Sequence, residues 1–227
     1  MKIRCSAIGK IMTKPRSKSE VLSKTTKSYI EQLIKEQIYN TRYTFTSKYT
    51  DKGLIVEDNS IDFIADQLGY GMLVKNEEYF TNDFLTGTPD VITNDTIIDV
   101  KNSWDCFTFP LFSDGIENKD YMYQLQGYMA LTGKRKAKLI YVLSDTPINL
   151  IEKEAYYKSK NMGYDELDGD IYKECELRMT YTNTPNEVKI KVYDIDYDPE
   201  IVAEIYERVN MCNDYAIELI KKTKFIK

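Results

Sequence analysis

The sequence predicts one α/β domain in which helices flank a mixed central sheet. Segments with helical periodicity alternate with short runs rich in β-branched residues, which is the pattern of this fold class. The run from Thr96 to Lys101 is rich in β-branched and apolar residues, as a largely buried strand should be. No internal repeat or low-complexity linker divides the 227 residues. A chain of this length buries about 70–75% of its unfolded surface on folding, which is ample for a core.

The composition is ordinary for a soluble globular protein, with 42% hydrophobic and 30% charged residues. No apolar run approaches the roughly 20 residues that a membrane span needs, and the N-terminal segment lacks the apolar stretch of a signal peptide. We therefore expect a cytoplasmic protein. The cysteines have neither zinc-site nor disulfide-framework spacing, and we expect buried or partly buried free thiols at Cys5, Cys106, Cys175 and Cys212.

The chain contains no histidine, which excludes Ser-His-Asp triads, HNH-type nucleases and imidazole-ligated metal sites. Carboxylate and lysine chemistry on a hard cation such as Mg²⁺ remains for hydrolysis. The net charge of −5 is unevenly spread, because residues 1–50 carry eleven Lys or Arg against three Glu. This basic quarter favours a phosphate-binding surface, although a solvated amphipathic helix explains any single residue equally well.

The N-terminal quarter contains a short apolar-polar element at residues 5–12, which ends at the break Lys14-Pro15-Arg16. A helix is predicted from Ser23 to Tyr39, because its apolar residues have helical spacing. The Thr- and Tyr-rich span from 41 to 50 has no clear period, and we expect a loop or an irregular strand there.

A second helix, from Gly53 to about Leu68, carries an informative acid. Glu57 completes the i, i+3, i+7 progression of its apolar stripe. A carboxylate on a buried face is costly unless it is paired or binds a metal. The alternative is that Glu57 reaches solvent from the edge of the stripe. The predicted stripe consists of Leu54, Ile61, Ile64, Ala65 and Leu68.

Two strands are expected next, at residues 72–80 and 84–86, joined by the turn Asn82-Asp83. They lead through a Gly-Thr-Pro turn to Asp90.

The strand at 96–101 places an acid beside a lysine. Because strand side chains alternate between faces, Asp99 and Lys101 share one face with Ile97, and Val100 belongs to the other. For such a strand in isolation, an Asp-Lys pair facing solvent is the alternative. Ser103 and Trp104 follow at the strand's exit, where loops commonly build sites; Trp104 is either a core residue or a base-stacking platform.

The segment from Lys119 to Leu131 is predicted to be helical and to end at Gly133. Gln124 and Tyr128 are four residues apart and therefore share a face. The remaining elements are a strand at 136–144, a helix from 145–147 to about Met162, an acidic and partly helical segment at 164–186, an edge strand at 187–195 and a helix from 198 to about 222.

Pro89-Asp90 followed by Asp99-Val100-Lys101 resembles the motif of the PD-(D/E)xK nuclease superfamily. The resemblance implies one nuclease domain with a restriction-endonuclease-like core at about 53–144. A basic helical part at 1–50 precedes this core, and a helix, strand and helix elaboration at 147–227 follows it.

The same resemblance implies the catalytic set. Asp90, Asp99, the Val100 carbonyl and Glu57 would hold one or two Mg²⁺ ions, for which Mn²⁺ would substitute. Lys101 would orient or activate the attacking water.

The segments KGLIVEDNSIDFIAD and QLQGYMALTG resemble helices of the lambda-exonuclease-like (YqaJ) and RecB-like branches. This resemblance implies that Gln124 and Tyr128 contact DNA beside the active site; a Tyr- and Met-rich core stripe is the alternative. Iron–sulfur members of the RecB-like branch use three closely spaced late cysteines, whereas Cys175 and Cys212 lie far apart here. We therefore expect no iron–sulfur cluster and favour the lambda-exonuclease-like branch of phage recombination operons, which would act in the host cytoplasm.

The segment from Arg4 to Lys10 resembles the element with which that branch grips a 5′-phosphate. We expect no counterpart of the arginine that the family places further upstream, so Arg4, Lys10 or Arg16 would assist Ser6. Ser103 is a further candidate for DNA contact.

The leading functional prediction is a Mg²⁺-dependent DNA exonuclease that digests linear duplex ends from 5′ to 3′. A structure-specific or partner-guided endonuclease of the same fold and a noncatalytic module that binds DNA ends are the alternatives. The resemblance also implies a single-strand annealing protein as partner and a ring-shaped homotrimer.

Overall fold

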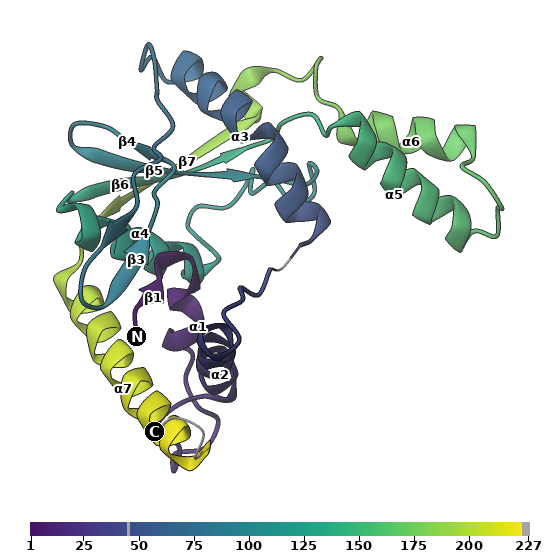
Figure 1. Cartoon of the computed structure of the whole chain (residues 1–227). Coiled ribbons are helices and arrows are strands. Elements are labelled where there is room, and N and C mark those ends of the chain that lie inside the picture. Colours follow the sequence, from purple (N-terminus) through teal and green to yellow (C-terminus); the bar gives the residue numbers. More distant parts are fainter. Residues whose placement is uncertain (45, 224–227) are drawn as a thin grey trace.

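The computed structural model describes residues 1–44 and 46–223 and has a mixed α/β architecture (Figure 1). Its strands form two sheets rather than one. The smaller sheet has the order β1-β3-β2 and consists of β1 (Ile3–Arg4), β2 (Phe80–Thr81) and β3 (Leu85–Gly87). The larger sheet has the order β4-β5-β6-β7 and consists of β4 (Val91–Ile92), β5 (Thr96–Asn102), β6 (Lys136–Val142) and β7 (Ile190–Asp196). Both sheets mix parallel and antiparallel pairs, so the predicted fold class is confirmed.

Strand β5 lies between β4 and β6 and carries the predicted alternation of side chains. Ile97 belongs to a core that includes buried residues of α4 (Lys119–Thr132) and of the terminal helices. Ile98 and Val100 pack with apolar residues of α3 (Lys48–Gln67) on the other face. Helices therefore cover both faces of this strand, which explains its apolar composition.

The N-terminal segment packs closely on α4. It forms a single 3-10 turn, η1 (Cys5–Ala7), followed by α1 (Ile8–Met12). Gly127 of α4 permits the approach, because a Cβ atom there would lie 2.5 Å from Ile8 Cδ1 and 2.9 Å from Cys5 Sγ. The absence of a side chain at this position lets the first turns of the chain lie directly against α4.

The two terminal helices confirm their predictions. Helix α2 (Lys24–Ile38) begins after Ser23, whose side chain accepts a hydrogen bond from the Thr26 N–H. Helix α7 (Pro199–Thr223) packs along α1 and α2 (Figure 1). Its Arg208 donates hydrogen bonds to the carbonyl groups of residues 11 and 13 at 3.0 and 2.9 Å, and thereby fixes the end of α1.

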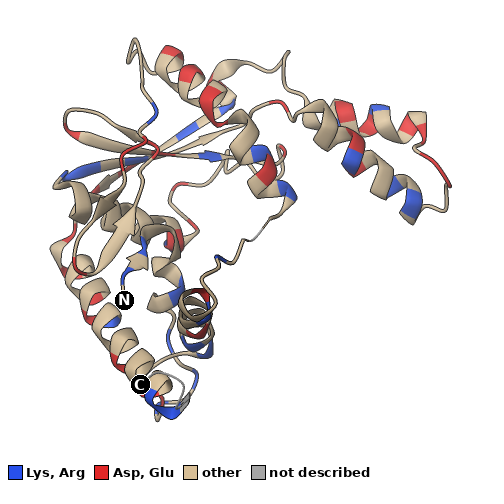
Figure 2. Ribbon diagram, in the orientation of Figure 1, with Lys and Arg blue, Asp and Glu red and all other residues tan. Residues whose placement is uncertain are grey.

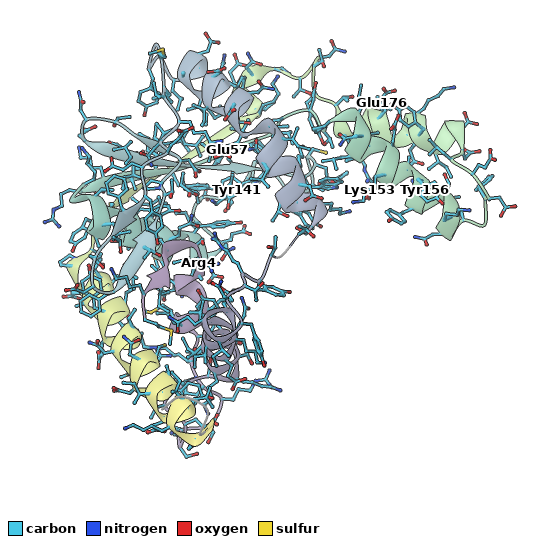
Figure 3. The ribbon with its side chains drawn as sticks, viewed as in Figure 1. Arg4, Glu57, Tyr141, Lys153, Tyr156 and Glu176 are labelled. Carbon is cyan, nitrogen blue, oxygen red and sulfur yellow. The ribbon has the colours of Figure 1, made fainter. Side chains whose placement is uncertain are left out.

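Helices α5 (Ile148–Asn161) and α6 (Gly169–Met179) form an arm that projects from the rest of the molecule (Figure 1). Lys153, Tyr156 and Glu176 lie on this arm (Figure 3). The arm has its own small apolar core, to which Trp104 contributes from the end of β5. Trp104 is 4% exposed, so it is a core residue.

The predicted core stripe of α3 is wrong at two positions, because Leu54 is 74% exposed and Leu68 is 39% exposed. The helix begins at Lys48, within the segment expected as loop, and its buried face starts with Lys52 and Val56. Leu54 instead lines an open hollow. The acidic residues of α3 are spread along its length (Figure 2).

Three further expectations differ from the structure. Residues 72–79 form an isolated bridge at Lys75 rather than a strand, because the segment is held by separate hydrogen bonds such as that from Asn76 N–H to the Asp90 carbonyl at 2.7 Å. Cys106 is exposed, since it lies in a turn after β5. Strand β4 was not expected. Position 45, in the predicted loop, lies outside the described residues. Among the residues that the structure describes, no helix is long and apolar enough to cross a membrane.

Candidate active site

Strands β4 and β5 bring the two predicted acids together. Val91 pairs with Ile98 in an antiparallel ladder, so Asp90, one residue before Val91, lies beside Asp99. The Oδ2 atom of Asp90 accepts a hydrogen bond from the backbone N–H of Val100 at 2.7 Å. Local pairing between two neighbouring strands thus builds this part of the site.

Asp99 is fully buried and contacts two other predicted residues. The ammonium Nζ of Lys101 lies 2.5 Å from Asp99 Oδ2. The side-chain Nε2 of Gln124 donates a hydrogen bond to Asp99 Oδ1 at 3.0 Å and a second one to the hydroxyl of Tyr128 at 3.0 Å. Helix α4 therefore supports the acid on β5 through an amide and a phenol that lie one turn apart.

An aromatic ring lies beside the lysine. The Nζ atom of Lys101 is 5.0 Å from the ring centroid of Tyr121, a separation at which a cation is attracted to the ring face. The Tyr121 ring in turn contacts that of Tyr141 edge to face, at 6.3 Å between centroids. Lys101 is thus held between a carboxylate and an aromatic face.

The close approach of two acids and a lysine shifts the pKa values of Asp90 and Lys101. Burial, together with the charge of Asp99, raises the pKa of Asp90 to about 7, although Lys101 and the Val100 N–H act in the opposite direction. Burial disfavours the charged form of Lys101, but Asp99 and Asp90 outweigh it and hold the pKa of Lys101 above its usual value. The two acids form a site in which a further positive charge would be stabilising.

The donor atoms fit a hard cation, because Asp90 and Asp99 both offer carboxylate oxygens in this negative environment. A third acidic ligand is not assembled: in the described part of the chain, no group of three or more His, Cys, Asp or Glu side chains could hold a metal ion. Glu57 instead pairs with Lys75 at 3.1 Å. Its charge still contributes to the raised pKa of Asp90, so Glu57 lies near the acids without joining them.

A hollow of about 910 Å³ adjoins these residues, and the fully buried Asp99 is not among the side chains that line it. Asp90, Lys101 and Gln124 line it, as do Glu57 and Tyr141, which are labelled in Figure 3. The hollow is large enough to admit a nucleotide-sized group.

The predicted DNA-binding residues lie in different places. Ser6 lines this catalytic hollow and also a second one of about 500 Å³, whose wall includes Arg4 and Tyr128. Ser103 lines only the catalytic hollow. Lys10 lies in a third hollow of about 820 Å³. The structure therefore brings Ser6 and Arg4 together and separates Lys10 from them, and DNA contact by all of these residues stays a prediction.

The sequence analysis did not identify Lys52. This side chain is fully buried, and its Nζ donates hydrogen bonds to the carbonyl oxygens of Trp104 at 2.9 Å and Ser144 at 2.8 Å. Burial lowers the pKa of Lys52 to about 8, although nearby acids partly oppose this. Lys52 thus ties α3 to the segments that follow β5 and β6. Its four-residue spacing from Val56 was the signal that could have revealed it.

Among solved structures, the chain is similar to a phage-related exonuclease from Haemophilus somnus 129PT, with 30% identity and a TM-score of 0.81 over 99% of this chain and 97% of that one. It is also similar to an alkaline exonuclease from Laribacter hongkongensis, with 16% identity and a TM-score of 0.66 over 98% and 91% of the two chains. A complex of that enzyme with dAMP gives a TM-score of 0.67. The Laribacter likeness shows the fold alone. No family model and no curated protein matches the chain.

Proposed function

Because the chain belongs to the lambda-exonuclease-like (YqaJ) branch of the PD-(D/E)xK nucleases, we propose that it digests linear duplex DNA from its ends in the 5′ to 3′ direction, with Mg²⁺ as cofactor and Mn²⁺ as a substitute. The observation that carries the proposal is the cluster of Asp90, Asp99 and Lys101 at neighbouring strands: Asp99 is buried between the other two groups, and Asp90 and Lys101 line one hollow.

In this proposal Asp90, Asp99 and the Val100 carbonyl would hold the Mg²⁺ ion. Glu57 would be a further ligand once it is free of its ion pair with Lys75. When bound, the ion supplies positive charge that stabilises the phosphate oxygens and favours ionisation of a water molecule.

Lys101 acts by position and charge. Its ammonium contacts Asp99 and Tyr121, and Lys101 is one of the residues that line the hollow. From there it can donate hydrogen bonds to the attacking water and to the phosphate. The water oxygen forms the new P–O bond and gives up a proton to the solvent, while the ester P–O bond breaks and the departing oxygen takes up a proton. Gln124 keeps Asp99 in place throughout, through its hydrogen bond to Oδ1.

The test compares end-labelled linear duplex, single-stranded and closed circular duplex DNA in the presence of Mg²⁺. We expect release of label from linear duplex and no cutting of the circle. Asp99→Asn and Lys101→Ala should each abolish this activity without unfolding the protein. Asp194→Asn and Lys138→Ala are the matched controls, because they break an ion pair on β6 and β7 that lies outside the catalytic hollow.

The outcomes separate the three predicted functions. Efficient cutting of closed circles would favour the endonuclease. Binding of linear ends without any cleavage would favour the noncatalytic module. If Asp99→Asn or Lys101→Ala cleaves at the wild-type rate, the assignment of the active site is wrong.

A further inference from the structure

The arm formed by α5 and α6 is attached to the body beside the catalytic hollow. Trp104 packs in the apolar core of the arm and also lines that hollow. The hydroxyl of Tyr181, just after α6, accepts a hydrogen bond from the Cys106 N–H at 2.9 Å. The root of the arm therefore lies next to the residues that follow β5, at the edge of the catalytic site.

The first turn of α3 connects the hollow to α5. Tyr49 lines the hollow, and its ring meets that of Trp104 edge to face at 5.9 Å between centroids. The neighbouring Lys48 lies 3.1 Å from Glu154 of α5, and Arg178 of α6 lies 3.6 Å from the same carboxylate. A strand of DNA that leaves the hollow past Tyr49 would therefore come next to α5.

Helix α5 presents two lysines and two tyrosines on one exposed face. Their spacing is i, i+3, i+4 and i+7, which places side chains on one side of a helix. Figure 3 shows Lys153 and Tyr156 along α5 and Glu176 on α6. We call this set the α5 stripe; its four exposed residues are Lys153, Tyr156, Tyr157 and Lys160.

The two lysines of the α5 stripe are not neutralised by an acid. Within the described residues, Lys153 makes no ion pair, and Lys160 donates its hydrogen bond to the Asp165 carbonyl rather than to a carboxylate. In contrast, Lys158 on the same helix lies 2.6 Å from Glu174 of α6. The exposed Glu152 lies at the edge of the stripe, so this face of α5 keeps a positive charge.

The aromatic rings of the stripe are accessible and lie beside a cation. Tyr156 is 42% exposed and Tyr157 is 57% exposed. Their rings meet edge to face at 5.8 Å between centroids, and the Nζ atom of Lys160 is 5.6 Å from the ring centroid of Tyr156. Aromatic side chains that stack on bases, interleaved with cations that bind phosphates, are typical of surfaces that bind single-stranded nucleic acid.

We propose that the α5 stripe binds single-stranded DNA beside the catalytic hollow, with bases stacked on Tyr156 and Tyr157 and phosphates bound by Lys153 and Lys160. The stripe is about 10 Å long, which matches about three nucleotides at stacked spacing. A single strand fits better than a duplex, because the bases of a duplex stack on one another and hide their faces. This inference rests on the proposed function, since digestion of one strand of a duplex leaves the other strand single at the site of cleavage.

The experiment measures binding without requiring cleavage. A short fluorescein-labelled oligothymidylate with hydroxyl groups at both ends is titrated with protein in the absence of divalent cations, and anisotropy yields the dissociation constant. The double variant Tyr156→Ser, Tyr157→Ser should bind about tenfold more weakly than the wild type. The double variant Lys153→Gln, Lys160→Gln should also lower the slope of log affinity against log salt concentration by about 1.4, whereas Glu152→Gln should strengthen binding.

The matched control is the double variant Lys173→Gln, Leu177→Ser, because both residues are exposed on α6, the other helix of the arm. It should bind like the wild type, and circular dichroism should show all variants folded. Unchanged affinity in the tyrosine variant, or an unchanged salt slope in the lysine variant, would overturn the proposal. An altered oligomeric state of the tyrosine variant in sedimentation velocity, with unchanged affinity, would assign the stripe to a contact between copies instead.

Binding and cleavage can fail separately. Weaker binding by both stripe variants, combined with no cleavage of linear duplex by the wild-type protein in Mg²⁺, would support the stripe and refute the proposed nuclease activity. Unchanged binding by both variants, combined with cleavage by the wild-type protein, would refute the stripe alone.

Discussion

Replacing Lys52 by methionine should change how the stability of the protein depends on pH. Lys52 is fully buried, and its ammonium donates hydrogen bonds to two backbone carbonyl oxygens, those of Trp104 and Ser144. Methionine has a similar length and no charge, so the substitution removes both hydrogen bonds and the cost of burying a cation. These two effects have opposite signs, and their balance depends on the protonation of Lys52.

The magnitude follows from the two pKa values. Lys52 has a pKa of about 8 in the folded protein, against 10.5 as the ordinary value. Between these pH values the unfolded chain binds more protons than the folded one, so the stability due to this group rises as pH increases. From pH 7 to pH 10 the gain is about 2–3 kcal/mol. The two carbonyl groups left without a donor cost about 1–3 kcal/mol each, so the effects nearly cancel at pH 7 and the loss of hydrogen bonds dominates at pH 10.

Urea unfolding of both proteins at pH 7 and pH 10 checks this expectation, followed by circular dichroism and by the fluorescence of the single tryptophan. At pH 7 the free energy of unfolding of Lys52→Met should be close to that of the wild type. At pH 10 it should fall below the wild-type value by about 2–3 kcal/mol. Lys153→Met, at an exposed position on the arm, should show no such difference. The reasoning fails if the free-energy gap between Lys52→Met and wild type is the same at both pH values.

Two further predictions concern the active site. Tyr121→Leu should lower kcat about tenfold with little change in KM, because it removes the ring that Lys101 faces. Tyr121→Phe keeps the ring and should restore the rate. Equal kcat values for the two variants would contradict this role. Since the pKa of Asp90 is about 7 before a cation binds, Mg²⁺ must displace a proton at lower pH, and calorimetry should show weaker binding at pH 6 than at pH 8. Asp90→Asn should lose that pH dependence, and an unchanged wild-type affinity would count against Asp90 as a ligand.

The arrangement on β5 was predictable because it depends on local geometry. Side chains of a strand alternate whatever surrounds it, so Asp99 and Lys101 had to share a face once the segment was extended. Helical spacing similarly placed Gln124 and Tyr128 on one side of α4. Gln124 donates its hydrogen bond to Asp99 at 3.0 Å. This contact depends on how α4 crosses the sheet, and no local pattern encodes it.

The limits of the sequence analysis are clearest in α3. Periodicity identified a helix there, but the start of the helix depends on the cap at Ser47, and its burial depends on where the sheet ends. Leu54 was therefore assigned to the core although it lines an open hollow. The buried cation Lys52 was missed for the same reason.

The sequence by itself determined the fold class, the family and the types and order of the candidate catalytic residues, because strand alternation, helical spacing and short motifs are properties of neighbouring residues. The tertiary structure alone decided which cations remain uncompensated. Within the described residues, Arg4 is neutralised by Glu36 and Glu57 is held by Lys75, whereas Arg42, which lines both the hollow beside Asp90 and the one beside Arg4, makes no ion pair. Ion pairs between distant segments require the whole chain to be in place, since electrostatic interaction depends on distance in space and on burial rather than on separation along the sequence.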